Sequence, residues 1–173
     1  MTIEAEQSGS MSLKAVLHEL GFTLVTGVPD SPLAPLVGEL GEGCDFGTWY
    51  VPGVREDACL AFAAGESLAG GLPLIFMKSA GFAGCLDVAT SLLQIYGLPA
   101  VLLVSWAGHA GLDVPHHNVI GVPLPELLNA LSIPYFRAPI GDLRLLREAL
   151  SLAAVRAFEV SSLTAVLAIP EGL

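Results

Sequence analysis

Short apolar runs alternate along this chain with segments of helical periodicity. Runs rich in strand-forming residues and bounded by turn residues are expected to be strands, at 22–26, 49–51, 74–77, 100–106, 135–136 and 164–169. Segments with apolar residues at helical spacing lie between them, at 13–20, from Pro32 to about Glu39, and at 54–71, 86–96, 124–131 and 142–157. The alternation predicts an α/β fold with a doubly wound, mainly parallel sheet and helices on both faces.

The pattern also predicts how deeply individual segments are buried. The run 100–106 is apolar throughout, which is typical of a central parallel strand that is covered on both faces. The segment 54–71 starts with charged residues, ends with two glycines and has no broad polar face between them. We therefore expect 54–71 to be a helix that is buried on most sides.

Two connections lack a regular pattern. The small residues of 78–84 predict a loop. The segment 107–123 has little periodicity and carries three of the four histidines, so we expect a long functional loop there.

Composition indicates a single domain that needs a partner. The chain has 173 residues, which predicts one domain over 12–173 after a polar, disordered tail at 1–11. Hydrophobic residues make up 53% of the chain and charged residues 14%, and the mean hydropathy is +0.68. So apolar a chain is expected to have much of its surface covered in an oligomer, with self-association among the possibilities.

Charge and cysteine content exclude several classes of function. The net charge of −10 and the scattered basic residues argue against nucleic-acid binding. No apolar run reaches the roughly 18 residues that span a bilayer, and the acidic start of the chain is unlike a signal peptide, so we expect no membrane insertion and a cytoplasmic location. Cys44, Cys59 and Cys85 show no metal-binding or disulfide spacing and are expected to be small core residues.

Polar residues follow the predicted strands at 27–31, 55–56, 78–81 and in the histidine-rich segment. Because the carboxyl ends of parallel strands meet at one edge, these residues are expected to converge there. Each has a structural alternative: Glu56 suits the first turn of any helix, and Asp30 or Ser31 before Pro32 suits a helix cap. The pair His116 and His117 could bind metal, but no further ligands follow at a recognisable spacing, so we assign no metal site.

The order of these motifs resembles the pyrimidine-binding domain of thiamine-diphosphate-dependent 2-oxo acid decarboxylases of the sulfopyruvate and phosphonopyruvate decarboxylase type. The resemblance covers 13–170 and rests on motifs that are specific in combination: 27–31 (Gly-Val-Pro-Asp-Ser), 55–56 (Arg-Glu) with Gly65, 77–81 (Met-Lys-Ser-Ala-Gly), 105–108 (Ser-Trp-Ala-Gly), 115–117 (Pro-His-His) and 127–135 (Leu-Leu-Asn-Ala-Leu-Ser-Ile-Pro-Tyr).

The resemblance implies roles for particular residues. Glu56, nine residues before Gly65, would hydrogen-bond N1′ of the cofactor's aminopyrimidine and so activate thiamine diphosphate. His117 would be a catalytic residue with a substrate or proton-transfer role, or else a polar loop histidine without a role. The remaining implied positions are cofactor-binding Pro29, Ser79 and Gly81, and substrate-binding Asp30, Ser31, Lys78, His109 and His116.

Two departures from the family pattern bear on function. Ala107 stands where the family usually has arginine, which leaves Lys78 as a candidate cation for an anionic substrate. The Gly-Asp-Gly motif that holds the diphosphate and Mg²⁺ in this family is absent from the sequence. The expected protein is therefore an α subunit that decarboxylates a 2-oxo acid together with a separate diphosphate-binding β subunit; a carboligase subunit and a non-catalytic α/β binding module are the alternatives.

Overall fold

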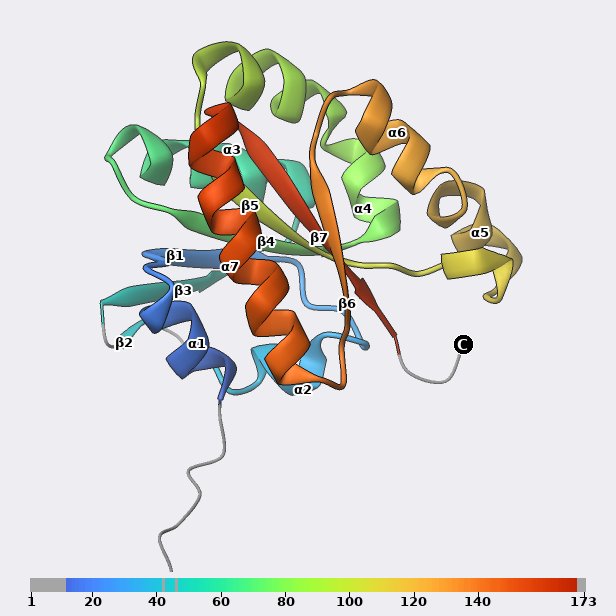
Figure 1. Ribbon diagram of the computed structural model, residues 1–173, viewed down its shortest axis with the longest axis horizontal. Coiled ribbons are helices and arrows are strands. Elements are labelled where there is room, and N and C mark those ends of the chain that lie inside the picture. The colour runs from blue at the N-terminus through green and yellow to red at the C-terminus, as the bar shows by residue number, and fades with distance from the viewer. Residues whose placement is uncertain (1–11, 42, 46, 171–173) are drawn as a thin grey trace, which may run out of the picture.

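The computed structural model describes residues 12–41, 43–45 and 47–170, and the expected tail at 1–11 lies outside this part of the chain. The described residues form a seven-stranded sheet in the order β2-β3-β1-β4-β5-β7-β6 (Figure 1). The strands are β1 (Leu24–Gly27), β2 (Gly43–Asp45), β3 (Thr48–Pro52), β4 (Pro73–Lys78), β5 (Ala100–Ser105), β6 (Tyr135–Pro139) and β7 (Leu163–Ile169). Only the edge strand β2 runs antiparallel to its neighbour in this sheet.

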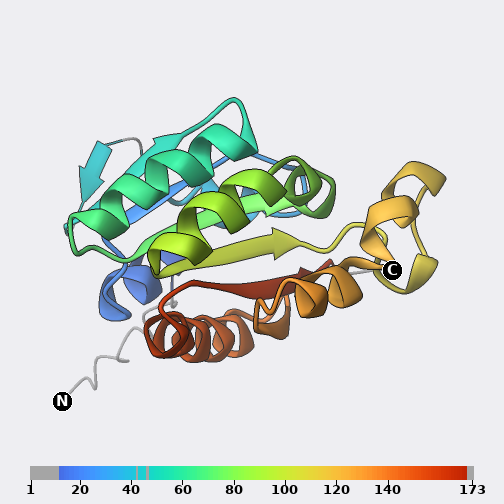
Figure 2. The ribbon, with the colours of Figure 1, turned by 90° about the horizontal axis from the view of Figure 1, so that it is seen from above.

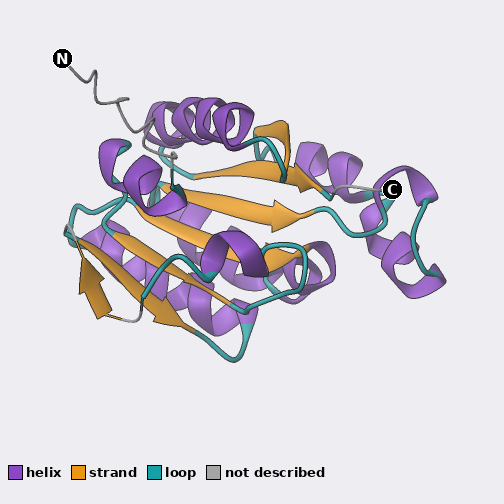
Figure 3. Cartoon of the chain, turned by 90° about the horizontal axis from the view of Figure 1, so that it is seen from below, coloured by secondary structure: helices purple, strands orange, loops and turns teal. Residues whose placement is uncertain are grey.

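Helices cover both faces of the sheet. They are α1 (Leu13–Glu19), α2 (Ala34–Val37), α3 (Glu56–Leu68), α4 (Ser79–Gly84), the π-helical segment η1 (Val88–Gln94), the short turn η2 (His109–Gly111), α5 (Pro115–Gly121), α6 (Leu124–Ala130) and α7 (Leu143–Val160). One core packs α1 and α7 on the sheet, and the second packs α3, α4, η1 and α6 on the opposite face (Figures 2 and 3). The doubly wound, mainly parallel fold predicted from the sequence is confirmed.

The central strands are buried because they lie between these two helical layers. Every residue of β5 is buried, as its uninterrupted apolar run predicts, and β4 and β7 are buried along almost their whole length. Helix α7 is capped by Asp142, whose carboxylate accepts hydrogen bonds from the backbone N–H groups of Arg144 and Leu145.

Two local expectations are wrong, and one strand was not expected. The segment 78–84 contains helix α4 rather than a loop, because small residues pack where α4 meets α3. The segment 107–123 contains η2 and α5, and Pro115 occupies the first turn of α5, where its missing N–H costs nothing. Strand β2 was not expected at all.

Helix α3 is buried on one side only, which corrects the expectation of a helix buried on most sides. Cys59, Leu60, Ala63 and Ala64 face the sheet. Phe62 and Leu68, on the outer side, are 54% and 69% exposed. The apolar pattern of this helix therefore has a second face that nothing in the described chain covers.

The structure tests some of the remaining expectations, on the cysteines and on membrane-spanning helices, and leaves others untested. Cys59 and Cys85 are buried free thiols, and the side chain of Cys44 lies outside the description. Among the described helices, none is long and apolar enough to cross a bilayer. The cytoplasmic location and the single-domain boundary are not tested and stay predictions.

Candidate active site

The site is built at the carboxyl edge of the parallel strands. Strands β1, β3, β4 and β5 run in the same direction, so the segments that follow them emerge at one edge. Figure 2 shows α5 beyond the carboxyl end of β5 at this edge. The segments that follow these strands therefore lie at one edge of the sheet, as the sequence predicts.

Glu56 is the first residue of α3, directly after Arg55. Its side chain is half-buried and lies against Gly81 of α4, where an added Cβ would come within 2.5 Å of Glu56 Oε1. Arg55 does not neutralise Glu56, because its guanidinium pairs with Asp57 at 2.6 Å. The sequence thus places a carboxyl group at a helix start and a glycine opposite it that keeps the space open.

The surroundings of Glu56 are apolar and contain no reactive thiol. Burial, followed by the nearby charge of Glu56, raises the pKa of Cys85 to about 12, so this cysteine stays protonated. Burial also raises the pKa of Cys59. A cavity of about 190 Å³ opens beside the start of α3, lined in part by Thr26, Gly53 and Phe62.

The turn after β1 holds Asp30 in a fixed position. Asp30 Oδ1 accepts a hydrogen bond from the backbone N–H of Leu33 at 3.0 Å, which is the cap expected before Pro32. Asp30 Oδ2 is buried and has no hydrogen-bond partner among the described residues. Pro29 and Ser31 of the same turn are exposed, and Ser31 lines a different cavity, of about 610 Å³, with residues of α2 and the turn before α7.

Ser79 connects α4 to the segment after β5. Its buried hydroxyl donates a hydrogen bond to the carbonyl of Ala107 at 2.9 Å. Lys78, the half-buried residue before it, ends β4 and caps α4 without a side-chain hydrogen bond to the helix. Ser79 and Gly81 therefore join the Glu56 region to the histidine-rich segment.

The histidine-rich segment contains a dyad that the sequence analysis missed. His117 Nδ1 lies 3.0 Å from Asp113 Oδ1, and the other oxygen of Asp113 accepts from the backbone N–H of Gly108 at 2.9 Å. A hydrogen bond from the N–H of Val114, followed by the one from His117, lowers the pKa of Asp113 to about 2. The available signal was an Asp and a His four residues apart across a helix start, with Pro115 between them.

Asp113 fixes one tautomer of His117. An ionised carboxylate can only accept hydrogen bonds, so Nδ1 of His117 carries the proton. Nε2 is therefore the ring atom that can exchange a proton with a ligand. The rings of His116 and His117 lie 4.3 Å apart in an edge-on arrangement. No hydrogen bond joins Glu56 to His117 in the described chain, so the structure gathers the predicted residues into two neighbouring groups.

The group of residues around His117 also includes Trp106 and His109. The ring of His109 packs edge-on against Trp106 at 4.4 Å, and Trp106 Nε1 donates to the carbonyl of Gly121 at 2.7 Å. Arg137 of β6, which the sequence analysis did not select, lies 5.2 Å from the same indole ring. No group of three metal-ligating side chains occurs within the described residues.

Comparison with known proteins identifies relatives. The chain is 34% identical over 132 residues to a phosphonopyruvate decarboxylase of Streptomyces viridochromogenes, covering 76% of this chain and 33% of that protein. It is 25% identical over 152 residues to the sulfopyruvate decarboxylase subunit alpha of Methanococcus maripaludis, covering 87% and 89% of the two chains. The chain is a relative of phosphonopyruvate and sulfopyruvate decarboxylases. The resemblance expected from the motifs is thereby confirmed, although no family model matches the chain.

Solved structures support the fold. Benzoylformate decarboxylase from Polynucleobacter necessarius matches 91% of this chain and 29% of its own with a TM-score of 0.62 at 16% identity. A putative thiamin diphosphate-dependent enzyme from Mycobacterium smegmatis matches with a TM-score of 0.59 at 18% identity, over 92% of this chain and 30% of its own. The chain therefore spans about a third of the phosphonopyruvate decarboxylases and of these solved enzymes, and most of one alpha subunit.

Proposed function

We propose that this chain is the α, pyrimidine-binding subunit of a thiamine-diphosphate-dependent decarboxylase that acts on a 2-oxo acid. The observation that carries the proposal is Glu56, a half-buried carboxyl group at the first turn of α3 that no described cation pairs with and that Gly81 leaves unobstructed. The residues present fit the cofactor: a carboxyl group that pairs with no described cation and has a glycine against it suits a planar heterocycle with one basic ring nitrogen.

In this proposal Glu56 would hold the aminopyrimidine of the cofactor by a proton shared with N1′, and would thereby favour its reactive tautomer. Gly81 lies against Glu56, and Pro29 and Ser79 are the other residues that we assign to cofactor binding. When bound, thiamine diphosphate supplies the electron sink for loss of CO₂ from the 2-oxo acid.

The substrate is assigned to the turn after β1 and to the histidine-rich segment. Asp30 offers its unpartnered Oδ2 to the substrate or to a proton, and Ser31 lies beside it. His117 exchanges a proton at Nε2 because Asp113 holds its Nδ1. Lys78, His109 and His116 supply positive charge or hydrogen bonds to an anionic 2-oxo acid.

The partner is proposed to be a separate β subunit that carries the Gly-Asp-Gly motif and holds the diphosphate and Mg²⁺. Two matched relatives are named as subunit alpha, which supports a partner for this chain too. Phe62 and Leu68 are exposed on the outer side of α3, the helix that begins with Glu56, which supports contact between that partner and this helix.

The decisive variant is Glu56→Gln, assayed with the β partner, thiamine diphosphate and Mg²⁺. Glutamine keeps the shape but cannot share the proton in the same way, so turnover should fall by about a hundredfold or more. Glu126→Gln is the matched control, because Glu126 also lies in a first helical turn but is exposed on α6, and its turnover should equal wild type. Undiminished turnover in Glu56→Gln would contradict the proposal.

The same preparation separates the two alternatives. A carboligase would release an acyloin when an aldehyde acceptor is added with the 2-oxo acid, whereas a decarboxylase would release the aldehyde and CO₂. A binding module without catalysis would give no heat of thiamine diphosphate binding in a calorimetric titration of the α–β pair.

A further inference from the structure

Arg137 is the arginine without a carboxylate partner in the described part of the chain. Arg55, Arg144, Arg147 and Arg156 each lie within 3.7 Å of an Asp or Glu oxygen. Arg137 has no such contact, although the chain carries seventeen acidic and seven basic side chains. In so acidic a protein, an unpaired guanidinium is a charge left available to something other than this chain.

Arg137 is nevertheless held in place. Its Cζ atom lies 5.2 Å from the centre of the Trp106 ring and 5.5 Å from that of Tyr135, and one terminal nitrogen lies 3.4 Å from the Tyr135 hydroxyl. Trp106 is itself fixed, because it is buried and bonded to the Gly121 carbonyl. Stacking on a fixed indole orients the planar guanidinium and leaves most of its N–H groups free for a ligand.

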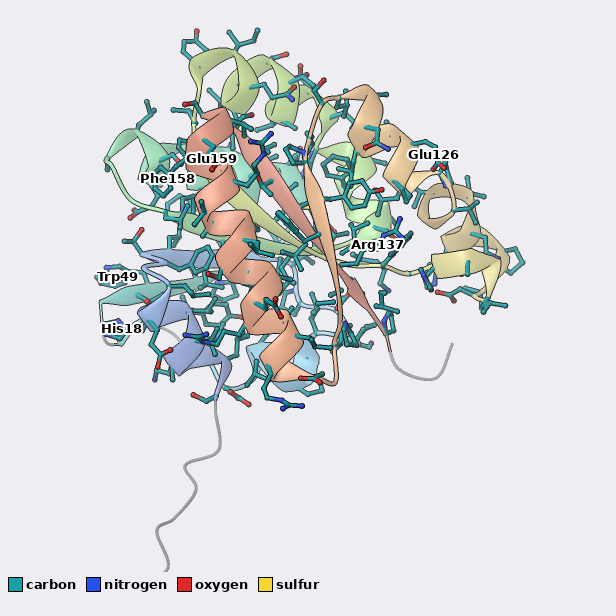
Figure 4. All side chains as sticks on the ribbon, viewed as in Figure 1. His18, Trp49, Glu126, Arg137, Phe158 and Glu159 are labelled. Carbon is teal, nitrogen blue, oxygen red and sulfur yellow. The ribbon has the colours of Figure 1, made fainter. Side chains whose placement is uncertain are left out.

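The position of Arg137 connects it with the candidate site. Trp106 directly follows β5, and its neighbour Ala107 accepts the hydrogen bond from Ser79 of α4. His109 packs against the same indole as Arg137. Figure 4 shows Arg137 between β6 and α5 in this view, on the side of the molecule that carries the histidine-rich segment.

We propose that Arg137, with His109 beside it on Trp106, binds a tetrahedral oxyanion, namely the phosphonate or sulfonate at the far end of a 2-oxo acid substrate. The inference rests on the proposed function for the identity of the substrate, and on the geometry around Trp106 for the anion site. Guanidinium suits such an oxyanion because two parallel N–H groups bind two of its oxygens. Ala107 offers no charge here, and Lys78 offers a point charge in place of the planar fork of a guanidinium.

Binding can be measured without turnover. Trp49→Phe leaves Trp106 as the single tryptophan, because the sequence contains two. Addition of phosphonoacetate, which carries a carboxylate and a phosphonate, should shift the indole N–H resonance of Trp106, and acetate at the same concentration should not. Arg137→Ala in this background should weaken phosphonoacetate binding by about tenfold to a hundredfold, as expected for loss of a charged hydrogen-bonding partner.

Arg156→Ala is the control, because Arg156 is a partly exposed arginine on α7, which packs on the opposite face of the sheet. It should bind phosphonoacetate like the parent. Two results would overturn the proposal. One is a phosphonoacetate-induced shift of the Trp106 resonance that is as large in Arg137→Ala as in the parent. The other is the absence of any such shift, both in the parent chain alone and in its complex with the β subunit.

Turnover by the complex supplies a second readout. Arg137→Ala should raise KM for phosphonopyruvate or sulfopyruvate about tenfold or more while leaving kcat and the use of pyruvate unchanged, and Arg137→Lys should restore part of the loss. An equal loss for pyruvate would show that Arg137 does not recognise the second anion. If the complex decarboxylates no 2-oxo acid, the proposed function fails, and the phosphonoacetate titration still decides whether Arg137 binds an oxyanion.

Discussion

Gly81 is the residue that leaves room for the carboxyl group of Glu56. A Cβ at position 81 would lie 2.5 to 2.7 Å from Oε1, Cγ and Cδ of Glu56, so Gly81→Ala must push that flexible side chain aside. Alanine is otherwise favoured in a helix, so the free energy of unfolding should change by less than about 1 kcal/mol. If Glu56 shares the cofactor proton as proposed, turnover should fall by about tenfold to a hundredfold, because its carboxyl group is displaced by a fraction of an ångström to an ångström.

The control for this variant lies in the same helix. An added Cβ at Gly84 meets nothing within 4 Å, so Gly84→Ala should keep wild-type turnover and gain a little stability. Steady-state kinetics with saturating β subunit and urea unfolding of the α chain measure the two effects. Equal turnover in the two alanine variants would mean that the position of the Glu56 carboxyl group does not matter.

At the scale of elements, the sequence predicts the sheet better than the site. All strands except β2 could be predicted, as could α7, because they have apolar runs or a long apolar period, and α1 could be predicted because its spacing is regular. Helices α4 and α5 could not, since each is only two turns or less and is made of small or polar residues whose pattern carries little information.

The candidate functional residues also differ in how far the sequence could predict them. Glu56 could be found because it stands at the start of a recognisable helix. Arg137 could not, because β6 meets the end of β5 only across β7, through pairings between residues about thirty to sixty positions apart in the chain. The outer side of α3 was misjudged because an apolar pattern cannot tell burial within one chain from burial against another.

The turn before α5 should make stability depend on pH through Asp113. Its pKa is lowered from the ordinary value of 3.8 to about 2 by hydrogen bonds from the Val114 N–H and His117. A lowered carboxyl pKa stabilises the fold above the unfolded value, and that contribution is lost as the pH falls from about 4 towards 2. Asp113→Asn should therefore be less stable than wild type at pH 6, with the gap closing across this window.

Thermal unfolding of both proteins from pH 6 to pH 2 measures the gap in midpoint. Asp142→Asn is the comparison, because Asp142 also accepts hydrogen bonds from backbone N–H groups at a helix start, and asparagine can accept them in its place. A gap for Asp113→Asn that is constant with pH would show that the ionised form of Asp113 does not stabilise the turn.

At the scale of the whole molecule, large apolar side chains are exposed on both helical layers, including the layer that carries the candidate site. Phe62 and Leu68 of α3 and Ile95 after η1 are at least half exposed, and they lie on the face of the sheet that also carries Glu56. We expect the diphosphate-binding subunit to cover this face, since the cofactor would then lie between the two chains. Phe62→Ser should weaken binding of that subunit by about tenfold or more, because a buried aromatic side chain contributes about 1.5 to 3 kcal/mol.

Phe158→Ser is the matched control for Phe62→Ser. Phe158 is 55% exposed, close to the 54% of Phe62, but it lies on α7, over the opposite face of the sheet. Calorimetric titration with the β subunit should give a wild-type Kd for Phe158→Ser, and both variants should unfold at the wild-type urea concentration because neither side chain is buried within the chain. If Phe158→Ser weakens binding of the β subunit more than Phe62→Ser does, the partner binds α7 instead of α3. If both variants weaken only self-association of the α chain, the exposed faces form contacts between copies of this chain.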